Sequence, residues 1–423
     1  MTIRIVIIGS GPTAIGAALR LRELQLEGDL DIEVTLLEKE KVVGGLASSV
    51  TDQRGFTWDL GVHVMGATKY KEFEKTTAEA VGQWNEIPRC VKANMKHIIQ
   101  ANDPLDNYVP YPVQDSIPYF PDHEKECCLS DLENLESTSS APAKNFSEFS
   151  EQVFGITLRD IFIQPYNEKV WTVPLKELSC VWVEGRVPKP NWQELTKRCR
   201  LTISTLHEQE EQKPKTVFRY PATLRGVGAM WKKIAYKLPK GWIQLEKAVA
   251  SIDAEEKLVL LVGLGIRRPQ PEVTENWSWV YFPQPDIIFY RCTFISNFNE
   301  SLTPNAAVFW SVVCEIGMDS DAEVVEEEAV EKTIQGLKTA GILYENNTIV
   351  SKWFCALPYG YPIPTINRDY ELAKCQPVFE KKGIFSRGRF GSWKYESANQ
   401  DHSFTMGREV VDRIFMNKPE KLN

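Results

Sequence analysis

Two glycine clusters near the N-terminus have the residue types and spacing of a phosphate-binding turn. Gly9, Gly11, Pro12, Thr13 and Ala14 follow directly on the apolar run 3–8. Glycines in such a turn let the backbone approach a pyrophosphate, and the N-terminus of the helix that follows supplies N–H donors. Alanine at the third glycine position is allowed by the pattern. The alternative interpretation is a tight turn that binds nothing.

An acidic residue and a second glycine pair extend this pattern. Glu38 ends the second apolar run, 32–37, where its carboxylate can accept hydrogen bonds from ribose hydroxyls. The second cluster follows as Gly44, Gly45, Leu46 and Ala47. A second glycine pair fits a long ligand threaded through the fold, which favours FAD over NAD. We therefore predict an FAD site on a strand–turn–helix–strand unit.

Composition excludes several other classes of protein. A chain of 423 residues can hold more than one domain, and a net charge of −8 argues against a nucleic-acid partner. No apolar run is long enough to span a membrane, so we expect no membrane partner. Nine cysteines without metal-ligand spacing predict no metal site and reduced thiols, as in a cytoplasmic protein.

Further patterns predict the elements around the nucleotide-binding unit. Apolar residues at helical spacing predict helical structure over 145–170, whereas the polar stretch 128–144 predicts a surface connection. A closing helix is expected at 405–415, packed back on the nucleotide-binding unit. Two strands joined by residues 253–257 are predicted at 242–252 and 258–266, and strands of an antiparallel sheet at 279–282, 289–298 and 308–316.

Several segments together resemble the eukaryotic UDP-galactopyranose mutases, nearly from end to end. The specific ones are PYNEKVW (165–171), FYR (289–291), GYPIPT (360–365) and SRGRFGSWKY (386–395) with NQDHS (399–403). This resemblance implies FAD as cofactor and a redox-neutral interconversion of UDP-galactopyranose and UDP-galactofuranose, in which N5 of the reduced flavin is the covalent catalyst. It also implies reduction of the flavin, with NADPH as the expected reductant.

The expected fold is α/β, with three discontinuous parts. They are a Rossmann-like FAD-binding domain (1–75, 218–257 and 383–423), a helical substrate domain (76–90 and 140–217) and an antiparallel sheet domain (91–139 and 258–382). The sequence does not indicate the oligomeric state.

The resemblance also assigns roles to individual residues. Arg186 and Arg291 are expected to clamp the two phosphates, since guanidinium forks suit phosphate oxygens, and His63 is expected beside the flavin ring. The other expected substrate-binding residues are Tyr111, Gln114, Asn167, Trp171, Trp279, Tyr281, Tyr361 and Tyr395. The two glycine clusters and Glu38 are joined in the expected cofactor site by Gly61, Val249, Arg389, Asn399, Gln400, Asp401 and Ser403. The alternative for the arginines is a surface ion pair, and for the aromatic residues a place in the core.

The chain departs from the family pattern in ways that leave other functions open. Val62 and Lys215 replace a glycine and an asparagine of the family, and a segment of the family is deleted between residues 257 and 261. The deletion would remove a strand from the FAD-domain sheet and expose apolar surface. A non-catalytic or defective paralogue therefore remains an alternative, as does an amine-oxidase-like FAD oxidoreductase.

Overall fold

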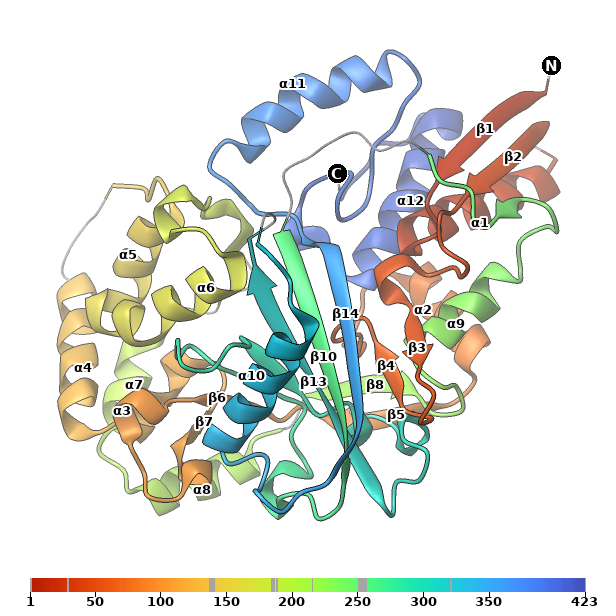
Figure 1. Cartoon of the computed structure of the whole chain (residues 1–423). Coiled ribbons are helices and arrows are strands. Elements are labelled where there is room, and N and C mark those ends of the chain that lie inside the picture. The colour runs from red at the N-terminus through yellow and green to blue at the C-terminus, as the bar shows by residue number, and fades with distance from the viewer. Residues whose placement is uncertain are drawn as a thin grey trace.

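Two parallel strands and a helix form the N-terminal unit of the computed structural model. The structure describes residues 2–28, 30–136, 141–183, 187, 189–214, 216–249, 257–319 and 322–422. Strand β1 (Ile3–Ile8) pairs in parallel with β2 (Ile32–Leu37), and α1 (Pro12–Leu26) connects them. On the other side of β2 lies β9 (Ile243–Gln244), so that the sheet order is β1-β2-β9. The expected strand–turn–helix–strand unit is confirmed (Figure 1).

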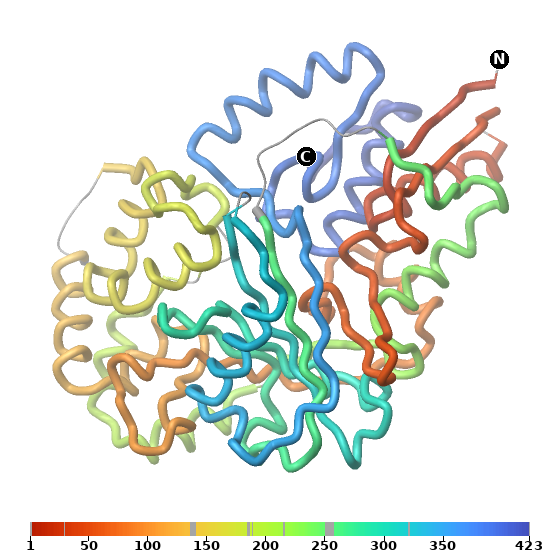
Figure 2. Tube along the Cα trace, in the orientation of Figure 1, coloured from red at the N-terminus to blue at the C-terminus, as the bar shows by residue number. Residues whose placement is uncertain are grey.

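The closing helix, α12 (Gln400–Met416), lies against α1, as predicted, and begins five residues earlier than expected. The first and last parts of the chain therefore run side by side (Figure 2). Arg408 donates two hydrogen bonds to Glu23 across this interface, at 2.9 and 2.7 Å. At the closest approach, a Cβ on Gly407 would clash with the Thr13 carbonyl oxygen. Only a glycine at this position lets the two helix backbones meet.

A seven-stranded sheet forms the centre of the molecule (Figure 1). Its order is β14-β10-β13-β12-β11-β6-β7, and α10 (Glu326–Thr339) packs on the core of one face. All pairs are antiparallel except β6–β11, so the sheet is mixed rather than purely antiparallel as expected. The strands are β6 (Val91–Asn94), β7 (Tyr108–Pro110), β10 (Lys257–Arg267), β11 (Trp279–Tyr281), β12 (Arg291–Thr293), β13 (Phe309–Met318) and β14 (Ile349–Tyr361).

Helices cluster beside this sheet around a core of their own (Figure 1). The helical stretch predicted at 145–170 comprises α5 (Phe146–Leu158), a π-helical turn at 159–163 and α6 (Gln164–Trp171). The prediction of a surface connection at 128–144 was wrong for its first part, because α4 (Asp122–Glu136) is a helix there. Cys128 and Leu132 of α4 are buried against α5, so tertiary packing stabilises a helix whose sequence is polar.

The remaining elements complete the molecule. They are β3 (Ser49–Thr51), β4 (Thr57–Asp59), β5 (Trp84–Pro88), β8 (Val217–Pro221), α2 (Lys71–Val81), α3 (Lys96–Ile99), α7 (Trp192–Arg198), α8 (Ile203–Gln212), α9 (Val227–Ala235) and α11 (Arg368–Glu380). The predicted strand over 289–298 is limited to β12, since a turn follows at 295–297. Among the described helices, none combines the length and apolar character needed to cross a bilayer.

Strand β1 lies at an edge of its sheet and leaves apolar side chains in water. Its partner among the described residues is β2 alone. Val6 is 62% exposed and Ile8 67% exposed, whereas Ile5 and Ile7 on the opposite face contact the core next to α1 and α12. Apolar side chains of this sheet are therefore exposed at β1. An uncovered, apolar edge strand promotes association with other chains.

The exposure of β1 can be tested by placing a charge on it. We expect Val6→Lys to change the free energy of unfolding by less than about 0.5 kcal/mol, because this side chain is already in water. Val34→Lys on β2 is the matched control and should cost about 3 kcal/mol or more, since Val34 is buried. Urea unfolding measures both, and light scattering should show less self-association for Val6→Lys. Equal costs at the two positions would mean that β1 is covered in solution.

Candidate functional site

The two glycine clusters meet at the N-terminus of α1. Gly11 is the N-cap residue and offers no side-chain cap to the first turn of the helix. The Gly44 nitrogen donates to the Ser10 carbonyl at 3.0 Å, which ties the second cluster to the first. Gly9 has a φ of 90° and Gly44 a φ of 118°, which L-residues with side chains rarely adopt. Gly9 and Gly11 therefore place no side chain at this helix N-terminus, which can bind phosphate.

Glu38 lies at the end of β2, as expected, but the protein already uses part of its carboxylate. Oε2 accepts hydrogen bonds from the nitrogen and the hydroxyl of Ser10, at 2.8 and 2.6 Å. Oε1 accepts one from the Glu40 nitrogen at 2.9 Å. Because a carboxylate has about four lone-pair sites, one site is left for a ribose hydroxyl. Glu38 therefore both holds the glycine turn and fits a ribose.

A pocket opens between the second glycine cluster and the seven-stranded sheet. Its space is about 380 Å³, including the opening to solvent. Five of the predicted site residues line it, namely Leu46, Gly61, His63, Tyr361 and Arg389. Strands β10, β13 and β14 contribute Val259, Leu261, Glu315, Leu357 and Gly360, and Leu60 and Val62 complete the lining. Residues that are more than 300 positions apart in the sequence thus form one site.

Val62, the departure from the family's glycine, lies in this lining without backbone strain. Gly61 next to it takes the left-handed conformation, with a φ of 122°. Since the unusual dihedral angle falls on Gly61, the β-branched residue after it is accommodated.

His63 lies in the pocket beside two arginines. Burial and the charge of Arg389 lower its pKa from 6.5 to about 4, with a smaller contribution from Arg291. Its Nε2 lies 3.2 Å from the Leu60 carbonyl oxygen. The imidazole is therefore neutral at physiological pH, and it can donate or accept one hydrogen bond without adding charge to the pocket.

The lowered pKa of His63 predicts a specific dependence of stability on pH. The unfolded chain takes up a proton on this residue at about pH 6.5 and the folded chain only at about pH 4. Stability should therefore fall as the pH drops from 6.5 towards 4, and this contribution should be constant above 6.5. We expect His63→Asn to reduce the loss of unfolding free energy between pH 7 and pH 5. Identical losses in the two proteins, measured by urea unfolding, would contradict the assignment.

Arg291 is held by a buried carboxylate that sequence reasoning missed. Its Nε and Nη2 donate to Oε1 and Oε2 of Glu315 at 2.8 and 2.6 Å, across the register pair of β12 and β13. Burial alone would lower the pKa of Arg291, but the carboxylate of Glu315 holds it above its usual value. Within the described part of the chain, Nη1 of Arg291 has no partner. The pair orients the guanidinium and leaves one edge available to a ligand. A charge inside the apolar run 311–316 was the signal that could have revealed Glu315.

Aromatic residues connect Arg291 to the helical region. Nη2 of Arg291 also lies 3.3 Å from the Tyr361 hydroxyl, and burial raises the pKa of that hydroxyl, so it stays protonated and can donate. Tyr361, Tyr395 and Trp171 contact one another, with ring centroids 4.8 to 6.2 Å apart. The indole Nε1 of Trp171 is buried without a hydrogen-bond partner among the described residues. An orphaned buried donor close to Tyr361 and Tyr395 fits a ligand that carries oxygen acceptors.

A second aromatic group extends the site along β11. Tyr281 lies 4.7 Å from Tyr111 and 5.1 Å from Tyr166 between ring centroids. Trp279, two residues earlier, belongs to the same cluster, so the shared face that was predicted for Trp279 and Tyr281 is confirmed. Gln114 follows Tyr111 by three residues in the sequence and is buried on the turn after β7. Asn167 donates to the Ile163 carbonyl at 2.7 Å, a bond within its own helix.

The predicted residues of α12 are engaged mainly with the protein. Gln400 accepts a hydrogen bond from Trp231 and donates to the His63 carbonyl at 3.2 Å, so it supports the His63 loop. Asp401 accepts a hydrogen bond from Thr68 at 2.7 Å. Asn399 is the N-cap residue and makes no side-chain cap bond, and Ser403 is buried. What this region offers a ligand is the set of N–H groups at the start of α12.

Of four further residues from the sequence analysis, the structure describes Val249 and Arg389. Val249 follows β9 and is 45% exposed. Arg186 and Lys215 lie outside the described residues. Arg389 donates to the Ala398 carbonyl at 3.0 Å and lies over the Tyr361 ring. Among the described residues no carboxylate pairs with Arg389, so it is the cation in the pocket whose charge is not neutralised.

Known proteins share this architecture. A family model described as an NAD(P)-binding Rossmann-like domain matches residues 7–79. The crystal structure of a reduced UDP-galactopyranose mutase is similar over 99% of this chain and 95% of that chain, with 30% identity and a TM-score of 0.87. The chain belongs to the UDP-galactopyranose mutase family. This membership and the Rossmann-like unit agree with the predicted α/β fold.

Two more distant structures share the fold of this mutase-family chain. One is a protein from Exiguobacterium sp. 255-15 named as a protoporphyrinogen oxidase, with 15% identity, a TM-score of 0.70 and coverage of 98% of this chain and 99% of that one. The other is a CLA-producing fatty acid isomerase from P. acnes, with 14% identity, a TM-score of 0.58 and coverage of 97% and 98%. Identities this low bear on the fold alone.

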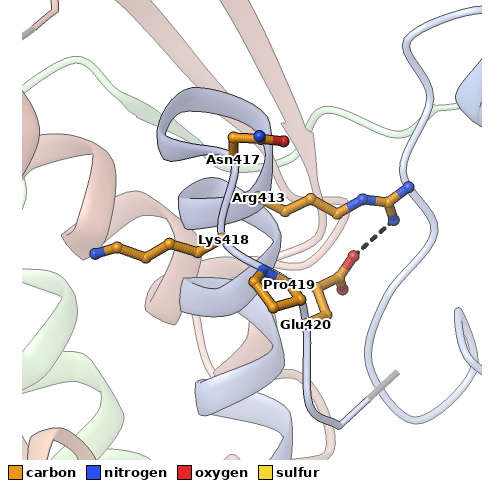
Figure 3. Close-up of a pocket in the computed structure, with 5 residues that line it drawn as sticks. All are labelled: Arg413, Asn417, Lys418, Pro419 and Glu420. Carbon is orange, nitrogen blue, oxygen red and sulfur yellow. Dashed lines mark hydrogen bonds and ion pairs between the residues drawn. The ribbon is translucent and has the colours of Figure 1, made fainter.

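No cluster of His, Cys, Asp and Glu that could hold a metal ion occurs in the described ranges. A second hollow lies away from the pocket and is lined by Arg413, Asn417, Lys418, Pro419 and Glu420 (Figure 3). None of these five residues lines the pocket that contains His63.

Proposed function

We propose that this chain is a UDP-galactopyranose mutase of the eukaryotic type, which interconverts UDP-galactopyranose and UDP-galactofuranose with reduced FAD. The observation that carries the proposal is the meeting of Arg291, Tyr361, Arg389 and His63 beside one pocket. The two arginines and the Tyr361 hydroxyl can donate hydrogen bonds to phosphate oxygens. The neutral imidazole of His63 adds no charge to the pocket. A net acidic protein needs such a local cluster of donors to hold a nucleoside diphosphate.

The residues present fit FAD. Gly9 and Gly11 place no side chain at the N-terminus of α1, which suits a pyrophosphate. Glu38 retains a lone-pair site for the ribose, and the pocket beside Leu46, Gly61 and His63 would receive the ring. When bound and reduced, FAD supplies the nucleophilic nitrogen N5. NADPH is the proposed reductant.

The chain's own residues bind and orient the substrate. Nη1 of Arg291 and the Tyr361 hydroxyl would bind the phosphates, together with Tyr395. These donors face the charge that develops on UDP as the sugar leaves, so their contribution is larger in the transition state than in the ground state. Trp171 would donate its orphaned N–H to the sugar nucleotide. Tyr111 would stack on the uracil, and Gln114 would bind its edge.

An anaerobic assay tests the proposal. The protein is reconstituted with FAD and reduced with dithionite, and UDP-galactofuranose is followed by chromatography as it turns into UDP-galactopyranose. We expect turnover in the reduced sample and none in the oxidised one. Folded, flavin-loaded, reduced protein without turnover would contradict a catalytic function.

A non-catalytic relative of the mutases is the second candidate. The exposed apolar residues of β1 favour it, because they match the loss of a segment that covers this sheet. It predicts a folded protein that binds UDP and leaves UDP-galactofuranose unchanged. An amine-oxidase-like activity is disfavoured, since the charge of Arg389 in the pocket, which no described carboxylate neutralises, would repel a cationic amine.

A further inference from the structure

The segment that follows α12, residues 417–422, is fixed to the protein by a network of charges in which one ion pair is buried. Glu420 is its centre, and its carboxylate accepts two hydrogen bonds from Arg387 at 2.5 and 2.7 Å. Arg413 of α12 donates to the same carboxylate at 2.8 Å (Figure 3). The side chains of Arg387 and Glu420 are only 2% and 5% exposed. Removal of one partner of a pair this buried leaves the other charge uncompensated, which costs far more than the loss of a surface ion pair.

The network has a fourth member on α11. Glu380 accepts hydrogen bonds from Arg387 at 2.6 Å and from Arg413 at 2.6 and 3.0 Å. Both arginines also lie over the ring of Phe385. Two arginines and two glutamates thus balance in charge, which offsets the cost of removing them from water. The backbone nitrogens of Lys421 and Leu422 donate to Glu409 and hold the end of the segment on α12.

Arg387 begins a turn, residues 387–391, that lies next to both ends of the candidate cofactor site. A Cβ on Gly388 would lie 2.5 Å from the Thr13 hydroxyl, so the turn packs against the first turn of α1. Arg389 lines the pocket and donates to the Ala398 carbonyl, next to the N-cap of α12. The Ser392 nitrogen donates to the Gly388 carbonyl at 2.8 Å and closes the turn.

We propose that residues 417–422 act as a clamp, in which Glu420 holds Arg387 and thereby positions the 387–391 turn over the cofactor. Glu420 and Arg387 are positioning residues, since neither lines the pocket that contains His63. The clamp goes beyond the proposed function, and its effect on the release of FAD rests on that function. It explains why the ion pair of Arg387 and Glu420 is buried although neither residue lines the pocket that contains His63. Its loss raises the rate at which FAD leaves, because the turn becomes free to move away from Thr13.

The test compares Glu420→Gln with wild type and with Glu371→Gln, a matched control on α11. Glu371 makes only an exposed pair with Lys374 at 3.6 Å, so its loss should have no effect. We expect Glu420→Gln to release FAD about tenfold faster, as truncation of one partner of a buried charge pair acts on dissociation. Flavin fluorescence after dilution measures this rate. Glu420→Asp, which keeps the charge, should recover part of the loss.

A double variant guards against a folding defect. Arg387→Met with Glu420→Met removes both charges, so that neither is left buried without the other, while Arg413 still pairs with Glu380. It should keep the wild-type melting temperature of the FAD-free protein and still release FAD faster. Unchanged FAD release in both variants would overturn the proposal.

Hydrogen exchange separates this proposal from the proposed function. In FAD-free protein, we expect faster exchange at 385–391 for Glu420→Gln than for wild type or Glu371→Gln. Unchanged exchange there would overturn the clamp, even if the wild type binds FAD. If the wild type binds no FAD, the proposed function fails, and faster exchange would still support the clamp on the turn.

Discussion

Replacement of Arg291 by lysine is expected to lower kcat/KM for UDP-galactofuranose by about 100-fold or more. Lysine keeps the charge but loses the planar fork that binds Glu315 through Nε and Nη2. It cannot satisfy the buried carboxylate and also present a second donor to a phosphate. Since this donor acts on the departing UDP, we expect kcat to fall as well as KM to rise.

Arg267→Lys is the matched control for this prediction. Arg267 ends β10 in the same sheet, is exposed and lies over the Phe309 ring. We expect its activity to stay within about twofold of wild type, as for most surface substitutions. Both variants are compared at equal content of reduced FAD, so that a loss of cofactor is not counted as a loss of catalysis. Equal activities of the two variants would contradict a phosphate-binding role for Arg291.

The second large effect is expected from Gly407→Ala, which should lower the free energy of unfolding by about 3 kcal/mol or more. The added Cβ would clash with the Thr13 carbonyl oxygen and lie 2.8 Å from the Ala17 nitrogen. Both are backbone atoms of α1, which cannot turn aside as a flexible side chain can. Alanine would otherwise stabilise a helix by about 1 kcal/mol over glycine, so a loss would show that the close approach of the helices dominates.

Urea unfolding measures this loss, with Gly66→Ala as its control. Gly66 has open space around its Cβ position and an ordinary φ, so alanine should change stability by less than about 0.5 kcal/mol. Because Thr13 belongs to the glycine turn, Gly407→Ala should also weaken FAD binding. A Gly407→Ala protein as stable as wild type would mean that α1 and α12 can move apart at no cost.

Local patterns in the sequence were sufficient for the nucleotide-binding unit. The apolar run 3–8, the glycines after it and Glu38 lie within one continuous stretch, so their spacing alone predicts β1, the turn, α1 and β2. The longer strands of the large sheet were also predictable, since β10 and β13 have continuous apolar runs. The polar α4 was not, because burial of Cys128 and Leu132 decides its structure.

Motifs singled out individual residues of the candidate site, but not the residues that bind them. The family resemblance placed Arg291 in a substrate site. No pattern in the sequence indicated that Glu315 would accept hydrogen bonds from two of its nitrogens. The sequence likewise contained no sign that Glu420 would bind Arg387, which lies 33 positions earlier. Both partnerships arise from strand register or from contacts between distant segments, which one-dimensional spacing does not encode.

The sequence by itself thus determined the phosphate-binding turn, the family resemblance and the residue types of the site. The tertiary structure alone decided that β1 is exposed, that no described carboxylate pairs with Arg389 and that Glu420 binds Arg387 at the start of the 387–391 turn. The physical reason is the range of the interactions. Turn geometry and helix termini depend on neighbours in the chain, whereas burial and ion pairing depend on which distant segments the fold brings together.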